Sequence, residues 1–460
     1  MTLQKLIKQS HILFMVVMLA SSCNQEPDTC LTTLCENGGT CNNGQCQCPP
    51  GYSGEQCEIG KILRTEFGSI STLQVVTRDI FAIWWDPKFD HSKDAENLLN
   101  WLIEIREDCV NNLDMMDPPN PAAGYYYNVY IHHGKDDLLP EWWGNGQGTD
   151  KYGMPYLGLP YGAHKDYGNV LHEGFHIFQY SANSPGFSYS GDSQWYVEST
   201  AQWYSAAHEP DDIHTFVEAG AIAANPQLAL WHSFTNEAPG DPKDWMFQVR
   251  QYGMHTYLYF LTEEKHVDPA IITGGFYVKT DLSPQEYLYV NTGGEALRNH
   301  FADWAAHNTA GFDYLRKDQV ERAWLELELA GDLNNAHHYV LELSDNEANG
   351  NFEPPVTLRP RGWSYNVIKI NNSEAATYQL AISGNELGSE GASSHFEARV
   401  VVSRPAGMEF ITMDLDDGLN GSTEVSLTAN DPELFIVIAA VPENFGGNQT
   451  YNYTVNLSRN

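Results

Sequence analysis

The interpretation of this chain depends on the stretch Val170-Leu171-His172-Glu173-Gly174-Phe175-His176-Ile177-Phe178-Gln179-Tyr180. Its apolar residues recur at helical spacing, which predicts an amphipathic helix. His172 and His176 are four residues apart, so both imidazoles lie on one face of such a helix and can converge on one metal ion. Glu173 beside them can act as general base toward a metal-bound water, as in an H-E-x-x-H site.

A third ligand is needed, because an H-E-x-x-H match also arises by chance in a chain with 17 histidines, where it is an inert part of a core. The segment Trp195-Tyr196-Val197-Glu198-Ser199-Thr200-Ala201 provides one in a second helical pattern rich in aromatic residues. Glu198 stands in a strongly apolar stretch, and a buried carboxylate is costly unless it is paired or bound to a metal. A ligand role for Glu198 therefore explains the pattern better than a surface role.

With these residues the chain resembles the gluzincins, zinc metallopeptidases whose third ligand is a glutamate on a second helix. The resemblance implies that His172, His176 and Glu198 bind zinc and that Glu173 is the catalytic base. The form W-Y-V-E-S-T-A is more similar to secreted bacterial members than to the N-E-x-x-S-D form of thermolysin. The resemblance spans residues 60–335, of which about forty carry specific motifs.

The same family places a Tyr or His opposite the zinc to stabilise the oxyanion. The run Gln251-Tyr252-Gly253-Met254-His255-Thr256-Tyr257 offers Tyr252 and His255 as the first choices and Tyr257 as another. His164 and Tyr167 are upstream alternatives, and ordinary packing is the competing explanation for each of these residues.

Six of the eight cysteines fall between residues 30 and 57, which predicts a small module held by three disulfides. The spacing, including Cys35-Glu36-Asn37-Gly38-Gly39-Thr40-Cys41, resembles an EGF-like domain at residues 27–58, and the uneven spacing disfavours a zinc ribbon. The resemblance implies the pairs Cys30–Cys41, Cys35–Cys46 and Cys48–Cys57. A buried, inert thiol is expected at Cys109, which lies in a helical pattern over residues 92–113.

The N-terminus predicts export. Lys5 and Lys8 precede a short apolar run and small residues, which is the pattern of a signal peptide over residues 1–22 and is too short to span a membrane. Cys23 follows Leu-Ala-Ser-Ser and resembles the lipidated cysteine of bacterial lipoproteins, although Ala20 replaces the usual leucine. We therefore expect a lipoprotein of the bacterial outer membrane or cell surface, or a secreted protein, that meets the membrane only through this N-terminal anchor.

The composition limits the kinds of partner that the chain can bind. Lys and Arg number 25 against 60 Asp and Glu, giving a formal net charge of −35, so binding to nucleic acid is not expected.

The C-terminal part of the sequence has the pattern of a β-sheet protein. From about residue 336 apolar and polar residues alternate in short runs separated by Gly, Asn, Ser and Pro, which predicts an all-β sandwich over 336–460. The predicted fold class is thus multidomain: an EGF-like module, an α+β zincin-like domain at 60–335 and a β-sandwich.

The predicted function is a surface-anchored zinc metallopeptidase that hydrolyses peptide or other amide bonds in a peptide or protein substrate. One alternative is a non-catalytic surface protein whose EGF-like and β-sandwich domains bind protein or glycan. Another is a structural adhesin without metal. Zinc content and hydrolysis distinguish the three.

Overall fold

The computed structural model describes residues 30, 34–36, 38–48, 52–68, 70–134, 138, 144–182, 184–211, 218–236, 249–316, 340–344, 351–371 and 374–459. The chain divides into two compact units, Met1–Lys61 and Ile62–Asn460. The predicted signal peptide and Cys23 lie outside the described residues.

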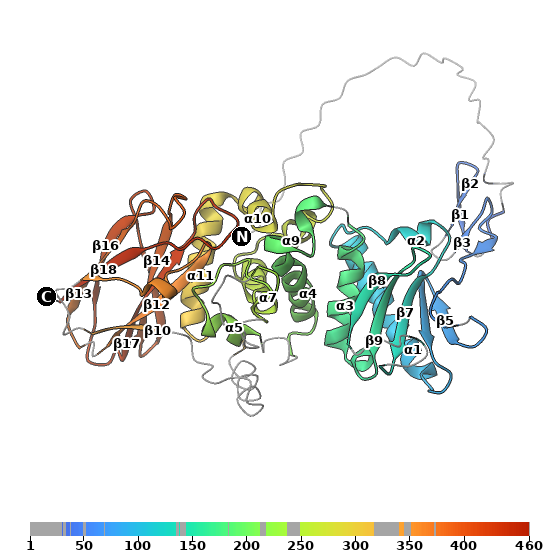
Figure 1. The fold of residues 1–460 in the computed structure, drawn as a ribbon, viewed down its shortest axis with the longest axis horizontal. Helices are drawn as coiled ribbons and strands as arrows, with labels where there is room; N and C mark the ends of the chain where they lie inside the picture. The colour runs from blue at the N-terminus through green and yellow to red at the C-terminus, as the bar shows by residue number, and fades with distance from the viewer. Residues whose placement is uncertain are drawn as a thin grey trace, which may run out of the picture. The chain divides into compact units, whose positions relative to one another are not determined.

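The first unit is a small module of two short hairpins (Figure 1). Strand β1 (Thr40–Asn42) pairs with β2 (Gln45–Gln47), and β3 (Tyr52–Ser53) pairs with β4 (Ile59–Gly60), both antiparallel. So few residues cannot bury a sufficient core, and cross-links replace it. All three predicted disulfides are confirmed: Cys30–Cys41, Cys35–Cys46 and Cys48–Cys57.

The second unit begins with a five-stranded sheet in the order β5-β6-β7-β9-β8. Its strands are β5 (Gln74–Arg78), β6 (Phe81–Trp85), β7 (Tyr127–His132), β8 (Gly146–Thr149) and β9 (Pro155–Pro160). The central strands β6, β7 and β9 run parallel, whereas β5 and β8 are antiparallel strands at the two edges. Strands β6 and β7 are buried at every position, as expected of parallel strands covered on both faces.

Helices cover this sheet and extend the unit. Helix α1 (Ser92–Asn111) buries Leu98, Leu102, Ile105 and Cys109, and Cys109 is a free buried thiol as predicted. Helix α3 (Tyr167–Gln179) packs on α1 and on α4 (Gln194–His208). The other helices are α2 (Pro119–Ala122), α5 (Ala219–Ala224), α7 (Arg250–Gly253), α8 (His255–Tyr259), α9 (Pro269–Gly274), α10 (Pro284–Thr292) and α11 (Gly294–Thr309).

Two further sheets form the C-terminal part. The first has the order β10-β12-β17-β14-β15, with β10 (Val340–Ser344), β12 (Ser364–Asn371), β14 (Phe396–Arg404), β15 (Gly407–Met413) and β17 (Glu433–Ala440). The second has the order β11-β18-β13-β16, with β11 (Asn351–Phe352), β13 (Thr377–Gly384), β16 (Asn420–Ser426) and β18 (Tyr453–Arg459). Side chains of both sheets, such as Ile436 and Leu380, share one hydrophobic core.

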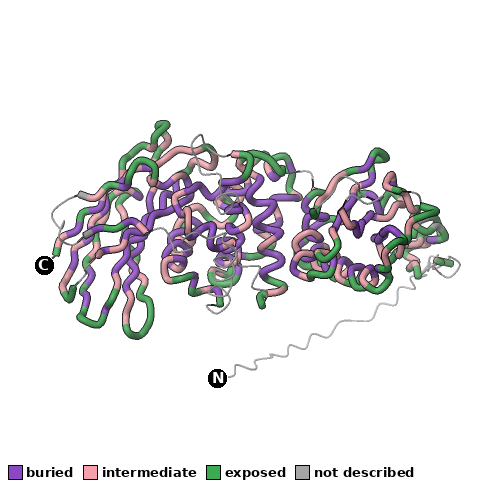
Figure 2. The backbone as a smooth tube through the Cα atoms, turned by 60° about the horizontal axis from the view of Figure 1, so that its bottom comes forward, coloured by how far each residue is buried: buried purple, intermediate pink, exposed green. Residues whose placement is uncertain are grey.

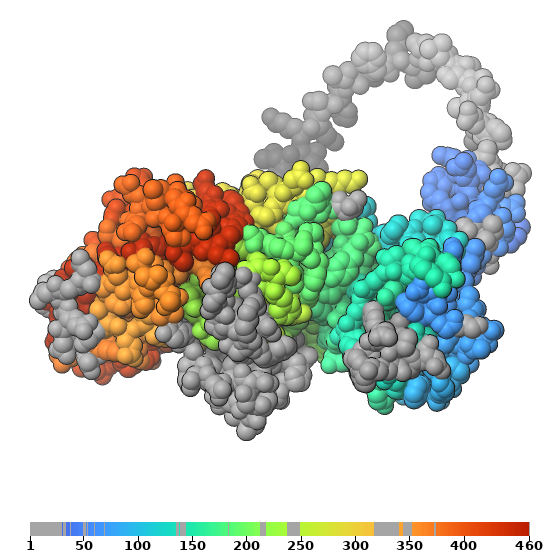
Figure 3. Space-filling view, in the orientation of Figure 1, coloured from blue at the N-terminus to red at the C-terminus, as the bar shows by residue number. Residues whose placement is uncertain are grey.

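The five-stranded C-terminal sheet is buried on its other face too. Val401, Val437 and Ala439 belong to the core of the helical region, and α11 packs against β14 and β17. Figure 2 shows the long buried stretches of these strands, and Figure 3 shows the C-terminal sheets lying against α10 and α11. Ile62–Asn460 is accordingly one compact unit, and the predicted boundary at 335/336 lies outside the described residues.

Candidate metal centre

The predicted motif lies on α3, and its local sequence explains how that helix forms. Asp166 caps the helix, its carboxylate accepting a hydrogen bond from the backbone N–H of Asn169 at 3.1 Å. A Cβ atom at Gly174, inside the motif, would lie 2.8 Å from Cδ1 of Ile105 on α1. The glycine therefore permits the close packing of α3 on α1, which leaves the motif histidines on the side that faces α4.

The structure brings His172, His176 and Glu198 together. Nε2 of His172 and Nε2 of His176 are 3.2 Å apart, and they lie 3.3 and 3.5 Å from Oε2 of Glu198. Ligands held about 2.0–2.1 Å from a tetrahedral metal are separated by about 3.3 Å from one another. The three atoms therefore have the spacing of one face of a tetrahedral coordination shell.

Hydrogen bonds fix which nitrogen of His176 carries a proton. The carbonyl of Val197 can only accept, so the atom of Gln179 that faces it at 3.1 Å is the amide nitrogen, which also donates to Thr200 Oγ1 at 2.5 Å. Oε1 of Gln179 then faces Nδ1 of His176 at 2.5 Å and accepts its proton. The lone pair of His176 is left on Nε2, directed at the other two ligand atoms.

His172 is held in the same way, with Nδ1 at 2.9 Å from Oε1 of Gln202. Three acceptor atoms then face one another, which is unfavourable without a cation between them. Burial raises the pKa of Glu198, but hydrogen bonds from His172 and His176 outweigh it and hold that pKa well below its usual value. Burial lowers the pKa of His176, but Glu198 outweighs that and raises it.

These ligands line a cavity of about 1040 Å³, which Glu173 and Tyr252 also line. Strand β8 forms part of the wall, because Gly146, Gln147, Gly148 and Thr149 all border the cavity. Gln147 donates from Nε2 to the backbone carbonyl of Glu173 at 2.7 Å and so connects this edge strand to the motif helix. The arrangement places a carboxylate, a phenol and an extended strand around the three ligand atoms.

The other predicted residues are distributed unevenly. The ring of Tyr252 lies 6.1 Å from that of His172, and burial raises its pKa well above the ordinary value, so its hydroxyl is a donor at neutral pH. His255 is fully buried, directs Nδ1 to the carbonyl of Tyr252 at 2.9 Å, and is not among the residues that line the cavity. The alternatives His164, Tyr167 and Tyr257 are likewise not cavity-lining residues.

Sequence reasoning assigned no role to three residues that act on the ligands. Tyr189 donates from its hydroxyl to Oε1 of Glu198 at 2.5 Å, from a loop without periodicity. Gln179 and Gln202 orient the two imidazoles as described above. The only signal for these two was their position on the motif helix and on the Glu198 helix, Gln179 three residues after His176 and Gln202 four after Glu198.

Comparison with known proteins identifies a part of the first unit. The sequence model of the EGF-like domain matches residues 29–57, which contain the three disulfides. Residues 29–57 form an EGF-like domain. Such a disulfide-rich module is typical of exported proteins. No curated protein matches the chain. Within the described part of the chain, no helix combines the length and apolar character needed to cross a bilayer.

Solved structures resemble parts of the chain only distantly. The pre-peptidase C-terminal domain of a Bacillus anthracis collagenase is 11% identical with a TM-score of 0.18, and the match covers 27% of this chain and 100% of that one. PliG of Aeromonas hydrophila, a periplasmic inhibitor of g-type lysozyme, is 15% identical with a TM-score of 0.17, covering 26% and 97%. A family GH115 4-O-methyl-alpha-glucuronidase is 8% identical with a TM-score of 0.15, covering 75% and 54%. Scores this low support no inference about fold or function.

Proposed function

We propose that this protein is a zinc metallopeptidase that hydrolyses amide bonds in peptides. The observation that carries the proposal is the convergence of the His172, His176 and Glu198 ligand atoms within 3.2–3.5 Å, on a cavity that Glu173 also lines. Two imidazoles and one carboxylate are the ligand set of catalytic zinc in peptidases, whereas calcium and magnesium take oxygen ligands. The buried amide of Gln179 supports this choice, because metal-bound histidines are usually held by such a second hydrogen bond.

A zinc ion held by these ligands would act as a Lewis acid, polarising the substrate carbonyl and lowering the pKa of an attacking water. Glu173 accepts the proton of that water on its carboxylate and returns it to the leaving amine. Tyr252 donates a hydrogen bond from its hydroxyl to the negative charge that develops on the carbonyl oxygen. Tyr189 keeps Glu198 oriented through the hydrogen bond to Oε1.

Strand β8 supports a peptide as the substrate. It is an edge strand of the sheet, it borders the cavity, and only β9 pairs with it among the described strands. An extended peptide can therefore add to its open side through backbone hydrogen bonds. Gly148 keeps this strand close to the sheet, since a Cβ atom there would lie 2.8 Å from the hydroxyl of Tyr156.

The proposal is tested with the purified exported chain. We expect about one tightly bound zinc ion per chain to be lost in Glu198→Ala, and hydrolysis of members of a diverse peptide library. Glu173→Gln should retain the zinc and lose hydrolysis by about a hundredfold or more, because it removes the base and leaves the ligands intact. Glu107→Gln, the same change at an exposed position of α1, is the matched control and should behave as wild type.

Two results would reject the proposal. If Glu198→Ala does not change the zinc content, Glu198 is not a ligand and the proposed metal centre is ruled out. If the wild type and Glu173→Gln hydrolyse peptides equally, Glu173 is not the base and the proposed mechanism is ruled out. A zinc-loaded protein that cleaves no peptide would instead favour the non-catalytic surface protein.

We propose further that the protein is anchored to the cell surface through a lipid on Cys23. The support is the signal-peptide pattern before Cys23 together with the disulfide-rich module that follows it. Metabolic labelling with a radioactive fatty acid tests it. Label on the wild type that is lost in Cys23→Ser is expected, and an unlabelled wild type contradicts the anchor.

A further inference from the structure

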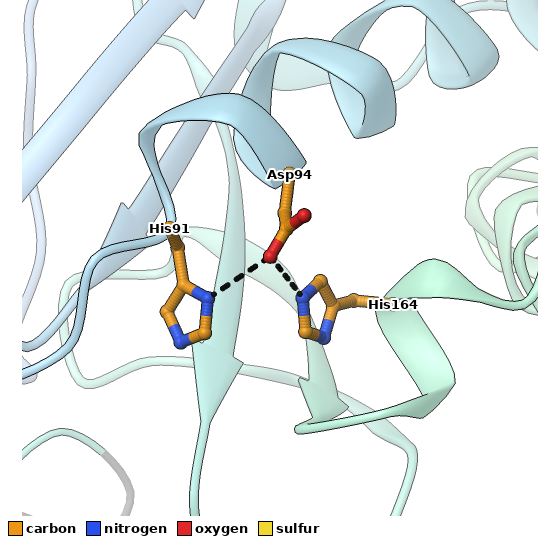
Figure 4. A group of neighbouring side chains, drawn as sticks. All are labelled: His91, Asp94 and His164. Carbon is orange, nitrogen blue, oxygen red and sulfur yellow. Dashed lines mark hydrogen bonds and ion pairs between the residues drawn. The ribbon is translucent and has the colours of Figure 1, made fainter.

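A second group of metal-binding side chains lies away from the cavity, at the carboxyl ends of the parallel strands. His91 follows β6, Asp94 is in the first turn of α1, and His164 lies in the 3-10 turn η2 (Ala163–Lys165) after β9 (Figure 4). The three residues come from segments 73 positions apart, and the parallel order of β6, β7 and β9 brings them together. Ligands of parallel sheets bind outside this edge of the strands.

The ligand atoms of this group have the spacing that one metal ion requires. Oδ2 of Asp94 is 3.5 Å from Nδ1 of His91 and 3.6 Å from Nε2 of His164. The contact of His91 is a long hydrogen bond, and the contact of His164 is too long to be one. Both separations are close to the about 3.3 Å between two ligands of one tetrahedral ion. Figure 4 shows both imidazoles directed at the same carboxylate oxygen.

The other nitrogen of each ring is already engaged. Nδ1 of His164 faces the carbonyl of Pro160 at 3.4 Å, and a carbonyl only accepts, so Nδ1 carries the proton. Nε2 of His164 is then a lone pair, and this atom is buried without a hydrogen-bond partner among the described residues. Nε2 of His91 lies 2.8 Å from Nε2 of His133, which leaves Nδ1 of His91 toward Asp94. A second hydrogen bond of this kind is typical of metal-bound histidines.

Lys165 supplies the competing explanation, since its Nζ lies 2.8 Å from Oδ2 of Asp94 and neutralises it. Its side chain is 44% exposed, however, and it also lies over the ring of Tyr161 at 5.1 Å. An exposed lysine can move away at little cost, whereas the two imidazoles beside it are buried. We interpret Lys165 as the cation that occupies the carboxylate when no metal is bound.

We propose that His91, Asp94 and His164 form a second binding site for a divalent transition metal, zinc in the first instance, separate from the motif on α3. Two imidazoles and a carboxylate exclude the oxygen-seeking ions calcium and magnesium. The site ties the start of α1 to η2, and η2 leads within two residues into α3. An ion there would therefore fasten the N-terminal end of the motif helix to the start of α1.

The test uses the full exported chain carrying His172→Ala and Glu198→Ala, which removes two ligands of the first centre. Zinc affinity is measured by competition with a chromophoric chelator. We expect about one ion per chain in this background, and Asp94→Ala should weaken its binding by about tenfold or more. Lys165→Ala should tighten it, because the competing cation is gone.

His208→Ala is the matched control, since His208 pairs with one carboxylate, Asp108, at 3.2 Å. It should leave zinc affinity unchanged. Absence of bound zinc in the background, or equal affinity with Asp94→Ala, overturns the proposal. Should Asp94→Ala fail to fold, Lys165→Ala decides alone: tighter binding supports the site, and unchanged or weaker binding overturns it. Because the first centre is disabled throughout, failure of the peptidase proposal does not affect this outcome.

Discussion

Replacing Gln179 by Leu tests whether its buried amide controls the metal centre. Gln179 is 4% exposed and joins Nδ1 of His176 to the carbonyl of Val197 and to Thr200. Leucine has similar volume but no polar atoms, so the Nδ1–H of His176 is left buried without its acceptor. The ring then loses the hydrogen bond that keeps the lone pair on Nε2. Loss of such a partner costs about 10- to 100-fold in metal affinity, or about 1.4–2.7 kcal/mol.

Gln202→Leu is the matched comparison, because Gln202 holds Nδ1 of His172 in the same manner but lines the cavity. Water can replace its oxygen there, so we expect a smaller loss, about threefold to tenfold. Zinc affinity is measured by chelator competition at one pH, with circular dichroism confirming that both variants fold. A Gln179→Leu protein that binds zinc within about twofold of wild type, or less weakened than Gln202→Leu, would refute the reasoning.

Two further predictions concern stability. Burial raises the pKa of Asp303, but the charges of Arg399 and Lys265 outweigh burial and lower that pKa in the folded state. The contribution of Asp303 to the free energy of unfolding is therefore present above about pH 3.8, its ordinary pKa, and is lost as the pH falls through its folded-state pKa. Urea unfolding of Asp303→Asn should show a deficit of about 2–3 kcal/mol at pH 7 that shrinks at pH 3; an equal deficit at both would contradict this. Gly174→Val should destabilise the protein by about 1–3 kcal/mol, because its side chain meets Ile105, and a variant as stable as wild type would show that α3 and α1 can separate freely.

The sequence predicted those features that local periodicity determines. The two motif histidines and Glu198 were recognisable because each stands at helical spacing within an apolar helix. His91 and His164 were not recognised as a pair, since their proximity depends on the parallel order of three strands. Tyr189 escaped notice for a related reason: it reaches Glu198 from an irregular loop, and no pattern reports where such a loop runs.

The C-terminal strands show a second limit of sequence patterns. Alternation of apolar and polar residues predicts a sheet with one wet face, and the four-stranded sheet has it, as in the alternating burial of β13. In β17 nearly every residue is buried, because α11 covers the face that alternation assigns to solvent. A run such as Leu434-Phe435-Ile436-Val437-Ile438 is equally compatible with either outcome, and the helix that covers it is too distant in sequence to be inferred.

The packing of α11 on β14 and β17 affects how the protein is degraded as well as how it folds. A single proteolytic cut between α11 and β10 would not give two parts that are stable on their own. Separating them would expose Trp304, Phe301 and Val437, which share one hydrophobic core, to water. Exposure of so large an apolar face promotes aggregation and further digestion. Under the proposed peptidase function, damage to the C-terminal sheets would therefore also disrupt the helices that carry His172, His176 and Glu198, because the unit from Ile62 onward is one compact body.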